Sequence, residues 1–124
     1  MSSETRTWKG SCHCGAVAFE VDAAPEAMQE VLACNCSMCG RSGAWMVFVP
    51  EGSFRLLSGE ADLRDYQFGH EHIHHPFCAT CGMKPFSHGL DPASGATVYS
   101  VNARCVDGVE LQDLQPSWYD GRAL

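Results

Sequence analysis

The sequence lacks any long hydrophobic run. No segment approaches the roughly 18 to 20 apolar residues that a membrane-spanning helix needs. The first eight residues also contain no apolar stretch of the length found in signal peptides. We therefore expect a cytoplasmic protein with no membrane partner.

Basic residues are also scarce. The chain has 8 lysines and arginines against 15 aspartates and glutamates, which gives a net charge of -7. The basic residues are spread singly along the chain, whereas binding to a nucleic-acid backbone requires clustered positive charge. We expect no nucleic-acid partner, although one or two arginines remain available to a small anionic substrate.

The chain has no linker and no low-complexity segment that would mark a second domain. Its 124 residues, 45% of them hydrophobic and 19% charged, fit one compact domain with a buried core. We predict an N-terminal extension over residues 1–9 and a single domain over residues 10–121. The pattern carries no signal for an oligomeric state.

Cysteine, in contrast, is abundant, with eight residues in the chain. In a chain without a secretory signal, such a number points to metal binding before disulfides. Seven of the eight fall into three clusters, and Cys105 stands alone. The clusters are Cys12 and Cys14; Cys34, Cys36 and Cys39; and Cys78 and Cys81.

The first and third clusters resemble each other, because in both a glycine follows the second thiol at once. Gly15 and Gly82 tolerate a positive φ and let backbone N–H groups approach the thiolates, as in a metal knuckle. Two knuckles supply four thiolates, so we predict a closed structural zinc site of Cys12, Cys14, Cys78 and Cys81. The alternative is two disulfides or four free core thiols. Structural zinc binds with on the order of 10 kcal/mol, comparable with the stability of a small domain, so its loss should unfold the protein.

The middle cluster offers three thiols within six residues and no obvious fourth ligand. Three protein ligands and an open position are typical of catalytic zinc, and we predict that Cys34, Cys36 and Cys39 hold a second zinc and are catalytic. A three-thiolate zinc is a weak activator of water but suits a substrate thiol, which it deprotonates. Two alternatives remain: Cys105 completes the set as a fourth ligand, or the cluster is a metal-free redox dithiol.

Histidines gather just before the third cluster, at His70, His72, His74 and His75. In a strand, alternate residues would share one face and could approach a metal. A solvated strand face explains the same pattern, and we favour it.

The remainder reads as short strands separated by turn signals, which predicts a mainly β domain. In the segment 16–21, Val17, Phe19 and Val21 should face the core. We also predict a short helical turn after Cys36, and either a helix or an extended segment near residues 26–30. Further strands are predicted at 45–49, 54–57, 63–68, 72–77 and 97–103.

The ordered motifs also resemble a known family. The segments Gly10-Ser-Cys-His-Cys-Gly-Ala-Val-Ala-Phe-Glu20, Cys34-Asn-Cys-Ser-Met-Cys39, Ser42-Gly-Ala44 and Phe77-Cys-Ala-Thr-Cys-Gly82 are similar to those of the glutathione-dependent formaldehyde-activating enzymes, a family that includes centromere protein V. The resemblance covers residues 10–121.

The resemblance implies a fold, a reaction and a division of the cysteines. The fold would be a small zinc-stapled antiparallel β domain of the Mss4-like or β-tent type, with two zinc ions per chain. The reaction would be that of a carbon-sulfur lyase, which joins formaldehyde to the thiol of glutathione to give S-(hydroxymethyl)glutathione. The outer knuckles would hold the structural zinc, and the middle cluster would hold the zinc that receives the substrate sulfur.

Three hypotheses follow. The first is an enzyme that adds glutathione or another small thiol to formaldehyde or a similar small aldehyde. The second is a zinc or thiol-ligand binding module without turnover, and the third is a structural zinc domain that serves as an interaction surface. Function resides in a site and not in a scaffold, so the arrangement of the middle cluster must distinguish them.

Overall fold

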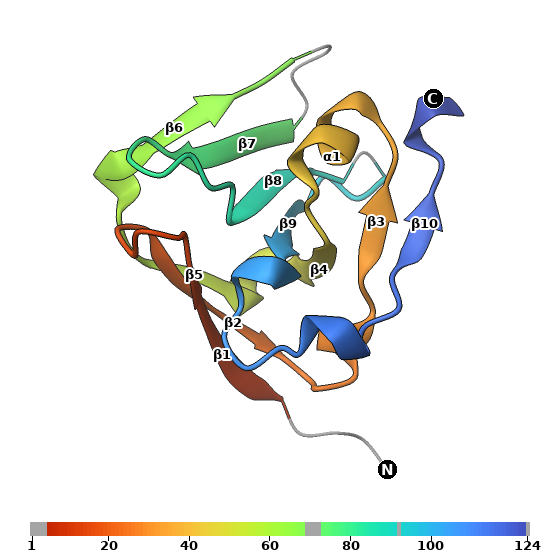
Figure 1. The fold of residues 1–124 in the computed structure, drawn as a ribbon, viewed down its shortest axis with the longest axis horizontal. Helices are drawn as coiled ribbons and strands as arrows, with labels where there is room; N and C mark the ends of the chain where they lie inside the picture. The colour runs from red at the N-terminus through yellow and green to blue at the C-terminus, as the bar shows by residue number, and fades with distance from the viewer. Residues whose placement is uncertain (1–4, 69–72, 92, 124) are drawn as a thin grey trace.

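The structure is a computed structural model that describes residues 5–68, 73–91 and 93–123 (Figure 1). Its strands are β1 (Arg6–Ser11), β2 (Ala18–Ala23), β3 (Leu32–Cys34), β4 (Met46–Pro50), β5 (Phe54–Ser58), β6 (Leu63–Tyr66), β7 (Ile73–Cys78), β8 (Phe86–Leu90), β9 (Thr97–Asn102) and β10 (Ser117–Tyr119). The α-helix α1 spans Ser37–Ser42. Short 3-10 turns occur at Ala27–Gln29, Glu51–Ser53, Glu60–Asp62, Ala103–Cys105, Leu111–Asp113 and Gly121–Ala123. The prediction of a mainly β domain is confirmed.

The strands form two sheets. The smaller has the order β1-β2-β5 and the larger the order β10-β3-β4-β9-β8-β7-β6. Neighbouring strands are antiparallel except for β10, which pairs in parallel with β3. None of the helices in the described part of the chain is long and apolar enough to cross a membrane.

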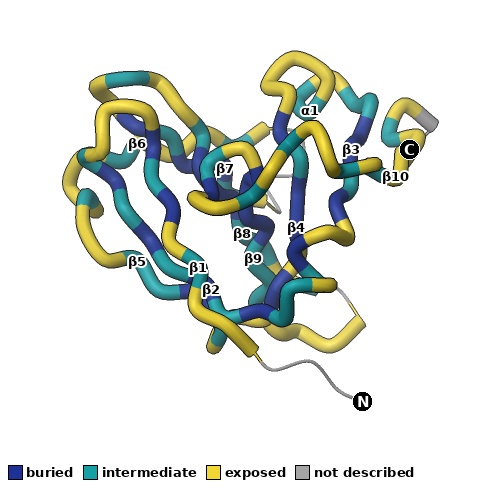
Figure 2. Tube along the Cα trace, turned by 60° about the horizontal axis from the view of Figure 1, so that its bottom comes forward, coloured by how far each residue is buried: buried dark blue, intermediate teal, exposed yellow. Residues whose placement is uncertain are grey.

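A hydrophobic core fills the space between the two sheets. Val17, Phe19 and Val21 are fully buried, as predicted from the alternation in this segment. Phe54 from the small sheet lies 4.6 Å, centroid to centroid, from Phe86 of the large sheet. Figure 2 shows the buried stretches running along the central strands and the exposed stretches along the loops. Burial of this aromatic cluster holds the sheets face to face.

The large sheet therefore has one face in the core, and its alternate residues point to the other face. On β9, Val101 belongs to the core cluster, whereas Ser100 lies in the wall of a cavity on the opposite side. On β4, Val47 is in the core and Phe48 lines the same cavity. The period-2 alternation of these strands thus separates a packing face from a cavity face.

An ion-pair cluster ties the strands of the small sheet together on its exposed side. Arg55 on β5 donates to both carboxylate oxygens of Asp22 at 2.8 Å and to Glu20 at 2.7 Å. Thr7 on β1 donates to the same Asp22 carboxylate at 2.8 Å. Since β2 pairs with both neighbours, this cluster spans the whole width of the sheet.

The structure differs from the predicted elements mainly at the shorter strands. The predicted helical turn after Cys36 is present as α1, and the segment near residues 26–30 contains a single 3-10 turn. Strand β1 begins at Arg6, so it includes residues that the sequence placed in the N-terminal extension. Strands β3, β8 and β10 were not predicted, because segments of three to five residues with few β-branched side chains give little periodic signal.

Candidate metal centres and the adjoining cavity

The first cysteine group brings together the four residues of the outer knuckles. The Sγ atoms of Cys12, Cys14, Cys78 and Cys81 all lie within 4.8 Å of one another. Cys14 Sγ is 3.7 Å from Cys12 Sγ and 3.6 Å from Cys78 Sγ, whereas a disulfide bond measures about 2.05 Å. Zinc–sulfur bonds of about 2.3 Å in a tetrahedron place the sulfurs about 3.8 Å apart. The donor set and its spacing therefore fit a tetrahedral zinc ion.

Both knuckles turn at the glycine that follows the second cysteine. Gly15 has φ +84° and Gly82 has φ +77°, in the left-handed region that favours glycine. The Gly82 N–H donates to the Cys78 carbonyl at 2.8 Å. The conformation expected at both glycines is present, and it directs the chain back toward the sulfurs.

Backbone hydrogen bonds in this group favour the thiolate form that binds metals. N–H groups of Cys14 and Met83 lower the pKa of Cys81 to about 6, and the N–H of Cys81 lowers the pKa of Cys78. The Ala16 N–H also lowers the pKa of Cys14, but neighbouring thiols and burial outweigh it and raise that pKa to about 11. The fold thus favours the thiolate form of Cys78 and Cys81.

This group also joins the two sheets. Cys12 follows β1 in the small sheet, and Cys78 ends β7 in the large sheet. Both are buried, with 3% and 0% of their surface exposed. In Figure 1 the β1–β2 connection lies near the end of β7, and the four sulfur atoms converge there. An ion held here would fasten one sheet to the other.

The second cysteine group lies where β3 meets α1. Its Sγ atoms, from Cys34, Cys36 and Cys39, lie within 4.8 Å of one another. Cys36 is the N-cap of α1, and its sulfur accepts from the Cys39 N–H at 3.3 Å, while the Cys36 N–H donates to Cys34 Sγ at 3.4 Å. Three convergent thiols with backbone donors fit a metal ion and leave room for one further ligand.

The surroundings shift the pKa values of Cys36 and Cys39 in opposite directions. Burial opposes ionisation of Cys36, but the Cys39 N–H and the neighbouring thiols lower its pKa overall. Burial and the nearby Cys36 raise the pKa of Cys39 to about 12. The surroundings therefore favour the thiolate at Cys36 and disfavour it at Cys39.

The last turn of the chain closes over this group. The Asn35 side chain donates to Asp120 at 3.0 Å and accepts from the Arg122 N–H at 3.1 Å. These contacts bring Gly121 so close that an added Cβ atom would stand 2.5 Å from Cys34 Sγ. Only glycine fits at this position without displacing the cysteines.

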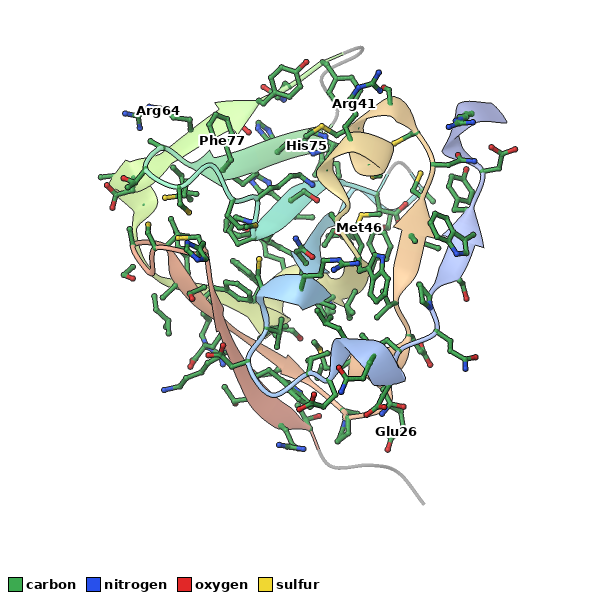
Figure 3. All side chains as sticks on the ribbon, in the orientation of Figure 1. Glu26, Arg41, Met46, Arg64, His75 and Phe77 are labelled. Atoms are coloured by element: carbon green, nitrogen blue, oxygen red, sulfur yellow. The ribbon has the colours of Figure 1, made fainter. Side chains whose placement is uncertain are left out.

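A cavity of about 460 Å³ opens beside the second group, on the outer face of the large sheet. Cys34, Cys36 and Cys39 form part of its wall, and so does Lys84. His75 from β7 and Met46 from β4, both labelled in Figure 3, line it as well. A volume of this size is typical of small-molecule sites.

Lys84 supplies a positive charge to the cavity. It follows the knuckle of Cys78 and Cys81 by only a few residues, and the Asn102 side chain fixes its carbonyl with a hydrogen bond of 3.1 Å. Burial lowers the pKa of Lys84, and the Cys39 and Cys36 sulfurs act in the opposite direction. Among the described residues, no carboxylate pairs with it. Its charge therefore acts on the cysteine group and on whatever enters the cavity.

Cys105 lies elsewhere. Its sulfur belongs to neither of the two groups, and Cys105 packs against the hydrophobic core. Burial and the nearby Cys12 and Cys81 raise its pKa to about 11, so its cysteine neighbours are those of the first group. The alternative in which Cys105 completes the middle cluster has no support in this arrangement.

The histidine cluster is divided by the fold. His74 pairs with Asp65 at 2.6 Å and stacks on His88, with a centroid distance of 4.7 Å. His75 is instead buried in the cavity wall. His70 and His72 lie outside the described residues. The described histidines contribute to neither cysteine group, although His75 and His88 line the cavity.

Sequence reasoning missed Lys84, Ser100 and Gly121. No local motif marks them, because each reaches the cavity or the cysteine group through strand register or through the return of the chain end. A lysine two residues after a metal knuckle was the one available signal.

Comparison with known proteins gives matches over most of the chain. The family model described as glutathione-dependent formaldehyde-activating enzyme matches residues 7–120. The chain is also similar to a Rhodobacter sphaeroides protein whose crystal structure was determined in a structural-genomics programme, with 35% sequence identity and a TM-score of 0.76. That match covers 90% of this chain and 99% of the other.

Proposed function

Because the chain belongs to the family of glutathione-dependent formaldehyde-activating enzymes, we propose that it adds a small thiol to formaldehyde or to a similar small aldehyde. The observation that carries the proposal is the second cysteine group, whose three convergent thiols open onto a cavity of small-molecule size. A closed structural site would need no such cavity. The activity would be that of a carbon-sulfur lyase of the S-(hydroxymethyl)glutathione synthase type.

In this proposal the cysteines have two roles. Cys12, Cys14, Cys78 and Cys81 hold a structural zinc ion, and Cys34, Cys36 and Cys39 hold a second zinc ion with one position open to the substrate thiol. When bound there, zinc would supply Lewis acidity that lowers the pKa of the substrate thiol. Glutathione is the thiol named by the family, and other small thiols have the same reacting group.

The reaction itself is balanced without an oxidant or reductant. A sulfur–carbon bond forms as the carbonyl π pair moves onto oxygen, and the proton lost by the thiol ends on that oxygen. The product is a hemithioacetal. The protein must hold the thiolate, orient the aldehyde toward it and favour the negative charge that develops on oxygen.

Lys84 is suited to the last of these tasks. Its ammonium group stands in the same cavity wall as the cysteine group, with no carboxylate partner among the described residues. Negative charge on the three thiolates and on the developing alkoxide is favoured by a nearby cation in a partly dehydrated site. Lys84 would act through this charge.

The proposal is tested with the variants Cys39→Ser and Cys105→Ser. We expect zinc-loaded wild-type protein to accelerate exchange between formaldehyde and the thiol adduct, followed by NMR. Cys39→Ser should abolish the acceleration without a large change in melting temperature, and Cys105→Ser, which alters a thiol outside both groups, should keep it. Undiminished turnover in Cys39→Ser would refute the assignment. A protein that binds thiol at the second site without any turnover would instead be a binding module.

A further inference from the structure

A row of four cross-strand neighbours, three of them polar, lies in the cavity wall. Ser100 on β9 pairs with Ser87 on β8 and with Phe48 on β4. The register of β7 with β8 pairs Ile73 with Gly89 and His74 with His88, and its extension by one residue in each strand puts His75 opposite Ser87. All four residues of this row line the cavity. Adjacent strands are about 4.8 Å apart, so His75 and Ser100 stand roughly 10 Å from each other along the row.

Two atoms of this row are buried without a hydrogen-bond partner. They are His75 Nδ1 and Ser100 Oγ, in residues that are 6% and 7% exposed. Such groups are rare in folded proteins, because an unsatisfied buried donor or acceptor is destabilising. The His75 ring is held by stacking on Phe68, with 5.4 Å between ring centroids, so it is fixed in place in the cavity wall. A bound molecule with a hydroxyl or carbonyl oxygen would satisfy either atom, and one oxygen reaches only one of the two because their residues lie roughly 10 Å apart.

The walls around this row are apolar, and several of the apolar side chains are exposed. Phe48, Ile73 and Leu90 are 54%, 49% and 65% exposed, and all three line the cavity. Large hydrophobic side chains that are exposed at one opening are typical of a surface that binds apolar ligands. A ligand that covers them gains hydrophobic free energy.

Charge, in contrast, is sparse in this cavity. Among its described lining residues, Lys84 and Asp91 carry the charges expected at neutral pH, and no arginine is present. Burial lowers the pKa of His75 to about 4, so this histidine is neutral. Glutathione carries two carboxylates and an ammonium group, and recognition of carboxylates typically uses arginine. The described lining residues offer a single cation, Lys84, for two carboxylates.

We propose that the cavity takes a thiol with an apolar body, and that Ser100 binds the oxygen of its aldehyde adduct. The inference rests on the proposed function and specifies its substrate class. The sulfur lies at the group of Cys34, Cys36 and Cys39, the hydrocarbon body covers the side chains at the opening, and the hydroxyl of the hemithioacetal meets the polar row. The sulfur, the hydrocarbon body and the hydroxyl of such an adduct would thus each contact a part of the wall with matching chemistry.

The first experiment compares benzyl mercaptan with glutathione on zinc-loaded protein by isothermal titration calorimetry. We expect benzyl mercaptan to bind at least about ten-fold more tightly. Phe48→Glu should weaken it by a similar factor, and Leu57→Glu, at a residue 52% exposed on the small sheet, should not. Glutathione binding as tightly as benzyl mercaptan would overturn the proposed substrate class and leave the proposed function standing.

The second experiment isolates the polar row with two unreactive ligands. 2-(Benzylthio)ethanol carries a hydroxyl close to the position of the adduct hydroxyl, and benzyl ethyl sulfide lacks it. We expect the hydroxyl to improve binding by roughly 2- to 10-fold in the wild type and to give no improvement in Ser100→Ala. Equal binding of the two ligands in the wild type would overturn the role of Ser100.

Cobalt-substituted protein separates a failure of this inference from a failure of the proposed function. A thiol that reaches the metal of the second group changes the thiolate-to-cobalt absorption. If neither thiol changes it while 2-(benzylthio)ethanol still binds, the proposed function fails and the apolar ligand class stands. If neither the benzyl thiol nor the benzyl sulfides bind, the proposed ligand class is wrong.

Discussion

Gly121 lies directly against Cys34, so that a Cβ atom at Gly121 would stand 2.5 Å from the Cys34 sulfur and 2.8 Å from Cys36 Cβ. The two residues are far apart in the sequence and meet because β10 pairs with β3. The chain end therefore helps to shape the second cysteine group.

We expect Gly121→Ala to disturb the second group and spare the first. The added methyl group must displace the Cys34 and Cys36 atoms or the last turn, and small shifts of this kind typically weaken metal binding by about 10- to 100-fold. Elemental analysis should show about one zinc ion per chain in the variant and two in the wild type. Gly52→Ala is the control, because a Cβ atom there meets nothing within 4 Å. Full zinc content in Gly121→Ala would show that the contact is unimportant.

Removal of metal from the first group should unfold the protein. Cys81→Ser removes a ligand that joins the two sheets, and structural zinc contributes on the order of 10 kcal/mol to small domains. We expect no cooperative melting of this variant near the wild-type temperature, measured by circular dichroism, whereas Cys39→Ser should melt within a few degrees of the wild type. An unchanged melting temperature in Cys81→Ser would refute the structural role.

Lys84→Gln should slow the reaction and leave both metals bound. The loss of one preorganised charge near a developing oxyanion costs roughly 10²- to 10³-fold in rate where such a charge is used. The measurement is the rate of thiol and formaldehyde exchange together with zinc content. Lys9→Gln, on the exposed side of β1, serves as the matched control. A variant at Lys84 with the wild-type rate would remove Lys84 from the mechanism.

The cluster around Asp22 predicts a dependence of stability on pH. Hydrogen bonds from Arg55 and Thr7 lower the pKa of Asp22 from 3.8 to about 2. A carboxyl with a lowered pKa in the folded state stabilises that state above pH 3.8 and loses this contribution as the pH falls through 2. The difference in unfolding free energy between wild type and Asp22→Asn, measured with urea, should be full at about pH 5 and small near pH 2. A difference independent of pH would mean that the charge of Asp22 does not stabilise the folded state.

The sequence was most informative where the cysteines of a group are close together along the chain. Cys36 and Cys39 lie within one turn of α1, and the two knuckles turn at Gly15 and Gly82, so local geometry already determines most of both groups. The assignment of the four outer cysteines to one group is likewise reproduced, since their sulfurs converge. Local spacing carries this information because each knuckle is formed by its own backbone.

Features that depend on strand register could not be predicted in this way. Ser100 faces the cavity because β9 lies between β4 and β8, and that order follows from pairing between segments far apart in the chain, such as Phe48 with Ser100. The histidine pattern predicted one shared face for alternate residues, but of its two described members, His74 and His75, it is His75, on the other face of β7, that lines the cavity. Side-chain direction along a strand has period two, so the identity of the buried face is settled only by what covers it.

The two faces of the large sheet should also diverge at different rates among related proteins. Val101 and Val47 belong to the core, where a change in side-chain volume disturbs the close packing on which the fold depends. Phe48 and Leu90 line the cavity and are exposed. Neither residue belongs to the hydrophobic core. Replacements at these two residues can therefore accumulate and alter which molecules enter, while both cysteine groups and the scaffold that carries them persist.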